Sequence, residues 1–266
     1  MSYRLIVIAF MIAGSSTADA SIQTIHTSFG SGADTELRED EDMQRGGARD
    51  LNTRREDPAI NLEIIALRFD VSGINRSDIL SATIETISTR SDSASDSGLE
   101  FWGLHSDVAG QNWTEGALNM PWNTANPFPG LIHDDDLSTF PIVAADTTTL
   151  GTLTWGVAPT QGAVLNFGSS SLNSFMQLGS GDLVTFFLFR TSPKSAQIRL
   201  TSKETENLGD TGTNPLGAIV SDTFAPRLVL EIRDSVPGAV PEASSAVIWV
   251  LLGVACQFRR GSDRRK

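Results

Sequence analysis

The feature that most constrains the fold of this chain is a set of short segments in which apolar and polar residues alternate. Residues 64–73 read IIALRFDVSG, and the apolar positions of Ile65–Val71 fall on every second residue. The same period of two recurs in residues 196–204 and 227–234. This period is that of a β-strand with one buried face. Asp182–Arg190, in contrast, is apolar at almost every position, which is typical of a central strand covered on both faces.

These segments predict an all-β protein. Outside the two ends of the chain, no segment keeps an apolar stripe of helical period over ten or more residues. Clusters of Gly, Ser, Asn, Asp and Pro separate the strands, as in antiparallel sandwiches. The single cysteine, Cys256, excludes a disulfide framework, so an apolar core has to supply the stability. We expect one antiparallel β-sandwich domain over residues 21–233.

Two stretches inside this domain are predicted loops. Residues 89–98 are rich in serine and aspartate, a composition that does not pack into a core. Residues 123–141 hold three prolines and a triple aspartate. A loop of that length in a compact domain is usually functional or mobile.

The start of the chain has the pattern of a secretory signal peptide. Arg4 precedes an apolar run from Leu5 to Ala13, and a small-residue A-x-A site follows at Ala18–Ala20. This order of charged, apolar and small residues predicts a signal over residues 1–20, with cleavage after Ala20.

The other end combines a short apolar run with a basic cluster. The run from Ala246 to Phe258 is shorter than the roughly 20 residues of a comfortable membrane helix, so residues 243–258 predict a marginal span. The positive-inside rule keeps the following tail, residues 259–266, in the cytoplasm. Its basic residues are Arg259, Arg260, Arg264, Arg265 and Lys266.

The residues just before this helix suggest that the membrane tether is temporary. Val240, Pro241 and Glu242, followed by the apolar run and the arginines, resemble the PEP-CTERM sorting signal of Gram-negative bacteria. The usual motif is Pro-Glu-Pro, and Ala243 replaces the second proline here. The resemblance implies that residues 234–242 are a linker and sorting motif cut by an exosortase-like enzyme. The inner membrane would hold the precursor transiently, and the protein would reach the cell envelope, cell surface or extracellular matrix. A permanent anchor is the alternative.

Five landmarks of the domain, in this order and spacing, resemble the DNRLRE-type domain of secreted bacterial proteins. They are Gly32–Asp40, Ala66–Ile74, Ile79–Glu85, Asn112–Pro127 and Leu200–Ile232. The sequence departs from the family pattern at Val71, where leucine is usual, and at Lys203, where arginine is usual. The resemblance implies a jelly-roll β-sandwich related to carbohydrate-binding modules.

Charge and motifs narrow the function. The formal charge of −12 makes nucleic acid a poor partner, because an acidic surface repels phosphates. The sequence contains no nucleophile elbow, zinc-protease helix, phosphate-binding loop or dinucleotide fingerprint, and its three histidines are scattered. We therefore expect a non-catalytic protein that binds extracellular polysaccharide or is structural. A small polysaccharide-degrading enzyme is the alternative, since a catalytic acid pair is defined by its spacing in space and not in sequence.

Two tryptophans are the candidate sugar-binding residues. The flat rings of Trp113 and Trp122 would stack on a sugar if exposed, whereas buried rings would fill the core and bond their N–H groups internally. Trp102 and Trp155 are predicted core residues.

Calcium is the candidate metal, because two acidic stretches gather the oxygen ligands that it prefers. The residues concerned are Glu39, Asp40, Asp134 and Asp136. Neither stretch has EF-hand spacing, and solvated acidic turns are the alternative. A structural calcium is implied by the resemblance alone. Arg38, Arg68 and Glu204 are expected to pair internally across the sheet. Lys203, where the family pattern has arginine, would lack bidentate geometry, which weakens the case for a specific role there.

Overall fold

The computed structural model describes residues 19–38, 43–44, 46–55, 62–90, 97–106, 111, 113, 115, 120–121, 145–191, 194–209 and 222–234. Within them, residues Ala20–Arg233 form one compact unit. Several predictions lie outside the described residues: the signal segment up to residue 18, the sorting motif, the membrane helix and the basic tail. Trp122 and the four calcium candidates Glu39, Asp40, Asp134 and Asp136 also lie outside them. No helix in the described part of the chain has the length and apolar character needed to cross a membrane.

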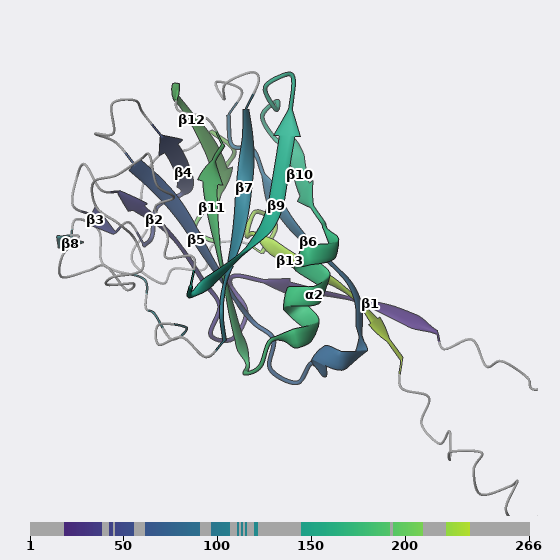
Figure 1. The fold of residues 1–266 in the computed structure, drawn as a ribbon. Helices are drawn as coiled ribbons and strands as arrows, with labels where there is room; N and C mark the ends of the chain where they lie inside the picture. The colour runs from purple at the N-terminus through teal and green to yellow at the C-terminus, as the bar shows by residue number, and fades with distance from the viewer. Residues whose placement is uncertain are drawn as a thin grey trace, which may run out of the picture. The chain divides into compact units, whose positions relative to one another are not determined.

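The unit contains two antiparallel sheets (Figure 1). The first has four strands, joined in the order β1-β13-β6-β10. These strands are β1 (Ala20–His26), β13 (Arg227–Arg233), β6 (Ile79–Ile87) and β10 (Val164–Phe167). The two ends of the unit meet in this sheet, because Ala20 of β1 lies opposite Arg233 of β13.

The second sheet follows the order β8-β3-β2-β5-β11-β7-β9, and β4 pairs with both β5 and β12. Its strands are β8 (Met120–Pro121), β3 (Met43–Gln44), β2 (Ala33–Arg38), β5 (Leu62–Asp70), β11 (Leu183–Arg190), β7 (Ser97–Leu104), β9 (Thr147–Trp155), β4 (Asp50–Arg55) and β12 (Lys194–Thr201). Every strand pair is antiparallel. The all-β prediction is therefore confirmed.

The main core lies between the two sheets. Ile84 and Leu228 of the first sheet share one buried apolar cluster with Leu67 and Phe69 of the second. The outer face of the second sheet carries another buried cluster, which includes Ala66 and Trp102. The second sheet is thus covered on both faces.

Strand β11 shows why its sequence is apolar throughout. Val184, Phe186 and Leu188 belong to the cluster between the sheets, whereas Phe187 and Phe189 belong to the outer cluster. The prediction of a central strand covered on both faces is confirmed.

Strand β12 follows its predicted alternation with one exception. Ile198 and Leu200 are buried in the main core, as expected. Thr201, predicted to face outward, is also buried, because its hydroxyl donates to the carbonyl of Phe224 at 2.6 Å. A hydrogen bond to the backbone thus satisfies the polar group inside the protein.

The one α-helix among the described residues, α2 (Ser170–Leu178), is not predicted by the sequence pattern. The helix has only nine residues, too few for an apolar stripe of helical period to stand out in the sequence. Ser169 caps it by accepting a hydrogen bond from the Leu172 N–H at 3.0 Å, and Leu172 and Met176 enter the main core. Figure 1 shows α2 beside β6 and β9, strands of different sheets that it contacts. The remaining helical turn is the 3₁₀ segment η1 (Arg76–Asp78).

Candidate functional site

A groove of about 500 Å³ lies beside α2, and we call it the α2 groove. Its walls come from α2 and from the segments at the ends of β7 and β9. The lining residues are His105, Ser106, Thr148, Ser170, Ser171, Ser174, Phe175, Leu178 and Gly179. Hydroxyl groups therefore predominate among its polar atoms.

Hydrogen bonds hold the polar wall of the α2 groove in place. The Nε2 atom of His105 lies 2.6 Å from the hydroxyl of Thr148. The His105 N–H also donates to the carbonyl of Asp146 at 2.9 Å, which joins the end of β7 to the start of β9. The imidazole is thus positioned before any ligand arrives.

The apolar wall is formed by Phe175 and Leu178. The Phe175 ring packs against Phe186 of β11, with ring centroids 5.8 Å apart, and lies directly over Gly103. A Cβ atom at Gly103 would come within 2.5 Å of that ring, so only glycine allows this close approach. Leu178 is 85% exposed, so its side chain is accessible to a ligand.

A second cavity of about 410 Å³ adjoins the α2 groove at Ser106, and we call it the acidic cavity. Its walls include the carboxylates of Asp70 and Asp182. Asp70 is fixed by the N–H groups of Ser31, at 2.8 Å, and Ser72, at 3.0 Å. Burial alone would raise the pKa of Asp70, but these hydrogen bonds and the charge of Arg68 outweigh it, so the pKa is lowered. Asp70 is therefore an anion at neutral pH.

The chemistry of the α2 groove suits an uncharged polar ligand with an apolar face. Its described lining combines hydroxyls and an imidazole with an aromatic ring and a leucine, and it includes no carboxylate, guanidinium or ammonium group. Ligand sites typically pair apolar walls with a few fixed polar groups in this way.

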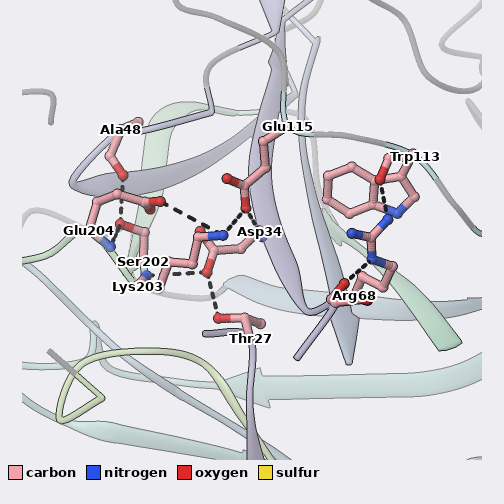
Figure 2. Close-up of polar contacts among 10 residues, drawn as sticks. Thr27, Asp34, Ala48, Arg68, Trp113, Glu115, Ser202, Lys203 and Glu204 are labelled. Carbon is pink, nitrogen blue, oxygen red and sulfur yellow. Dashed lines mark hydrogen bonds and ion pairs between the residues drawn. The ribbon is translucent and has the colours of Figure 1, made fainter. Parts of the chain in front are cut away.

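A second polar region lies inside the domain, and we call it the charge cluster: Asp34, Arg68, Glu115, Lys203 and Glu204. Figure 2 shows Asp34, Glu115 and Glu204 gathered around the ammonium group of Lys203. Lys203 and Glu115 form a salt bridge, and the Lys203 Nζ lies 4.0 Å from a Glu204 oxygen. The side chains of these three residues are at most 8% exposed.

Backbone groups complete the charge cluster. Asp34 accepts hydrogen bonds from the Thr27 hydroxyl at 2.6 Å and from the Lys203 N–H at 3.2 Å. The Asp34 N–H donates to Glu115 at 2.9 Å. Strand β2, the turn after β12 and residue 115 are thereby tied together, although they are far apart in the sequence.

Burial changes the protonation of the charge cluster. It raises the pKa of Glu204 to about 10, with the charges of Asp34 and Glu115 adding to the effect, so Glu204 is neutral at pH 7. Burial and the charge of Glu115 raise the pKa of Asp34 to about 6. Burial alone would lower the pKa of Lys203, but the surrounding carboxylates outweigh it and the pKa is raised. At pH 7, Glu204 is therefore a neutral acid beside the Lys203 cation.

The carboxylates of the charge cluster do not fit a metal site. One oxygen each of Asp34, Glu115 and Glu204 lies within 4.8 Å of the others, a spacing that could hold a cation. However, the Lys203 ammonium already lies among them, and calcium needs six to eight oxygen ligands. The lysine supplies the positive charge that a metal would bring.

Trp113, a predicted sugar-binding residue, is a core residue instead. It is 3% exposed and belongs to the outer cluster of the second sheet. Its Nε1–H donates to the Thr185 hydroxyl at 3.1 Å, and the Arg68 guanidinium lies 4.9 Å from the ring centroid. The ring and the N–H group of Trp113 therefore both have partners inside the protein. Trp102 is buried, as predicted, and Trp155 packs partly buried against the main core.

Arg68 and Glu204 are internal, as expected, but the partners of Arg68 differ from the prediction. The side chain of Arg38 lies outside the described part of the structure. Arg68 donates to backbone carbonyls, those of Ser31 at 2.7 Å and of Trp113, and does not pair with Glu204. Lys203, for which the sequence predicted a weak role, is the central cation. A point charge reaches several carboxylates at once, so the bidentate fork of arginine is not required here.

No pattern in the sequence predicts the α2 groove. Its residues come from a turn, a strand and a helix, and serine hydroxyls carry no spacing motif. The one available signal is the serine run at 169–171 before Leu172, which is typical of a helix N-terminus. No protein-family model matches the sequence, and no curated protein is significantly similar to it.

Proposed function

We propose that this chain is an exported, non-catalytic protein of the cell surface or matrix that binds polysaccharide through the α2 groove. The N-terminal signal pattern would direct export, and the PEP-CTERM-like tail would direct delivery to the cell surface or matrix. Residues of the α2 groove, and not Trp113, are proposed to bind the polysaccharide.

The observation that carries the proposal is the composition of this groove. Sugars offer hydroxyl groups around their edges and apolar C–H groups on their faces. Ser106, Thr148 and His105 match the hydroxyls, while Phe175 and Leu178 match the apolar faces. Since α2 is bonded to β6 and β9, the groove is built on a rigid part of the unit. The Asn173 side chain accepts from the Ala82 N–H at 2.8 Å, and Ser169 donates to the Leu150 carbonyl at 2.7 Å.

The charge cluster supports the resemblance to the DNRLRE-type domain. Four landmarks of that resemblance each contribute a residue to it: Asp34, Arg68, Glu115 and Lys203. Motif pieces separated by more than 30 residues thus have a common structural purpose. On this basis we propose that the two antiparallel sheets form a jelly roll.

One pair of assays distinguishes binding from catalysis. We expect the purified protein to be retained by one or more immobilised polysaccharides and to release no new reducing ends from them. Release of reducing ends would overturn the non-catalytic assignment in favour of a polysaccharide-degrading enzyme. Failure of every polysaccharide to bind would leave a purely structural surface protein.

The variant Leu178→Ser places any binding at the α2 groove. It removes an apolar contact that is 85% exposed, so retention should fall while the fold persists. Val157→Ser is the matched control, because Val157 is 82% exposed and lies outside the groove lining. Equal retention of both variants would contradict the proposed site.

The sorting proposal has its own measurement. Mass spectrometry of the protein recovered from the envelope or medium of its native host should find a mature chain that begins at Ser21. Its C-terminus should lie close to Pro241, without the basic tail. A chain that retains Arg259–Lys266 after export would instead indicate a permanent anchor.

A further inference from the structure

The two cavities meet at one residue. Ser106 lines both the α2 groove and the acidic cavity. Its hydroxyl lies 3.0 Å from that of Ser180, and it accepts from the Ser180 N–H at 3.2 Å, so this junction is itself held by hydrogen bonds. We propose that the two cavities form one extended site that binds an internal stretch of an uncharged polysaccharide chain; this inference rests on the proposed function.

The combined size favours several sugar units over a single one. The cavities measure about 500 and 410 Å³, and each alone is comparable with the pocket of a small ligand. A chain that lies across Ser106 would contact both, whereas a single sugar would fill only one. Affinity should therefore rise with the length of the chain.

The acidic cavity determines which chains are accepted. Asp182 is exposed on the segment before β11, and Asp70, at the end of the neighbouring strand β5, also lines the cavity. A carboxylate is a hydrogen-bond acceptor only, so it receives sugar hydroxyls but repels a uronic acid or sulfate group.

The two nearby cations, Arg68 and Arg76, are held by backbone carbonyls. Arg76 donates to the carbonyl of Gly181 at 2.9 Å, and Arg68 donates to that of Ser31 at 2.7 Å. Neither guanidinium lines the cavity. The wall presented to a ligand therefore consists of carboxylate, hydroxyl, amide and backbone groups, together with the side chain of Leu183.

The two parts of the extended site should make separable contributions. Leu178 belongs to the α2 groove and Asp182 to the acidic cavity, so a short fragment bound in the α2 groove would not reach Asp182. A long fragment would contact both. Only the long fragment should respond to a change at Asp182.

The test measures the affinity of the purified protein for fragments of cellulose, xylan and mannan with two and six sugar units, by titration calorimetry. A six-unit fragment of alginate serves as the anionic probe. We expect the best neutral six-unit fragment to bind at least tenfold more tightly than its two-unit form and more tightly than alginate. Asp182→Asn should weaken the six-unit fragment about tenfold, the loss of roughly one hydrogen bond to a charged group, and leave the two-unit fragment unchanged.

Two controls make the result specific. Leu178→Ser should weaken both fragment lengths, and Glu206→Gln, which removes an exposed carboxylate outside both cavities, should change neither. Equal affinities for two and six units, tighter binding of alginate, or no effect of Asp182→Asn on the six-unit fragment would overturn the extended site while leaving the proposed function intact. Failure of the wild-type protein to bind any polysaccharide would overturn both.

Discussion

The charge cluster and the α2 groove are both rich in polar side chains, yet they are built in opposite ways. In the charge cluster, Asp34, Lys203 and Glu204 are buried, and the Lys203 ammonium lies among acidic side chains of the protein. In the α2 groove, Ser170, Ser171 and Ser174 are exposed, and an apolar wall lies beside them. The first region is closed by its own residues, whereas the second is open to a ligand.

The residues that are distinctive in the sequence are therefore not the residues that suit ligand binding. The charged residues stand out in the sequence because a buried charge needs a partner of the opposite sign at a fixed place. The serines of the groove do not stand out, because an exposed hydroxyl is satisfied by water. Here the most recognisable motif supports the fold, and the least recognisable segment carries the candidate site.

The largest expected effect breaks the charge cluster. Lys203→Met removes the cation and leaves the carboxylates of Asp34 and Glu115 buried without it. Removing one partner of a buried ion pair costs about 3–5 kcal/mol. We therefore expect the free energy of unfolding, measured by urea denaturation at pH 7, to fall by about that amount.

Lys203→Arg is the control for this prediction, because it keeps the positive charge and should lose much less stability. Loss of less than about 1 kcal/mol in Lys203→Met would mean that the cluster is solvated and that its residues are not a closed network.

An intermediate effect is expected where the groove meets the core. Gly103→Ala places a Cβ atom 2.5 Å from the Phe175 ring, and such overpacking costs about 1–3 kcal/mol. Thermal unfolding should report the loss. Gly156→Ala, where a Cβ atom meets nothing within 4 Å, should change the stability by no more than about 0.5 kcal/mol. Equal effects of the two variants would show that Phe175 does not pack on β7.

A pH-dependent effect is expected from Glu204. Its pKa is about 10 in the folded protein and 4.5 when the side chain is free in water, so the folded state holds a proton that the unfolded state releases between these pH values. The free energy of unfolding should therefore fall as the pH rises from about 5 to 9, by at most about 1.4 kcal/mol per pH unit. Asp34, with a pKa of about 6, adds a fall of the same sign at the acidic end of this range.

Glu204→Gln keeps the shape of the side chain but removes its titratable group. The stability of this variant should therefore vary less with pH and exceed that of the wild type at pH 9. Urea denaturation at pH 5, 7 and 9 measures both profiles, and Glu206→Gln serves as the exposed control. A wild-type profile that rises toward pH 9 would contradict the neutral state of Glu204.

Much of the fold follows from the sequence because strands with one buried face carry their own period. Leu228, Leu230 and Ile232 of β13 alternate and are all buried, as expected. Helix α2 was missed because two residues, Leu172 and Met176, suffice to bury one face of a helix so short.

The candidate site was harder to predict than the fold. The rings of Trp113 and Trp122 indicated stacking by residue type alone, and type does not decide burial. Trp113 is buried because Arg68 and Thr185 provide internal partners for its ring and its N–H. The pairing of β7 with β9 brings His105 near Thr148, and no local pattern in the sequence records that contact.

The pairing of β1 with β13 has a consequence for the order of folding. Among the described strands, β1 has β13 as its only partner in the sheet, and β13 is the last strand of the unit. The first sheet therefore cannot close until nearly the whole domain has been synthesised, and such long-range pairing is slow. A chain that ends before residue 227 would therefore leave β1 without its neighbour in this sheet.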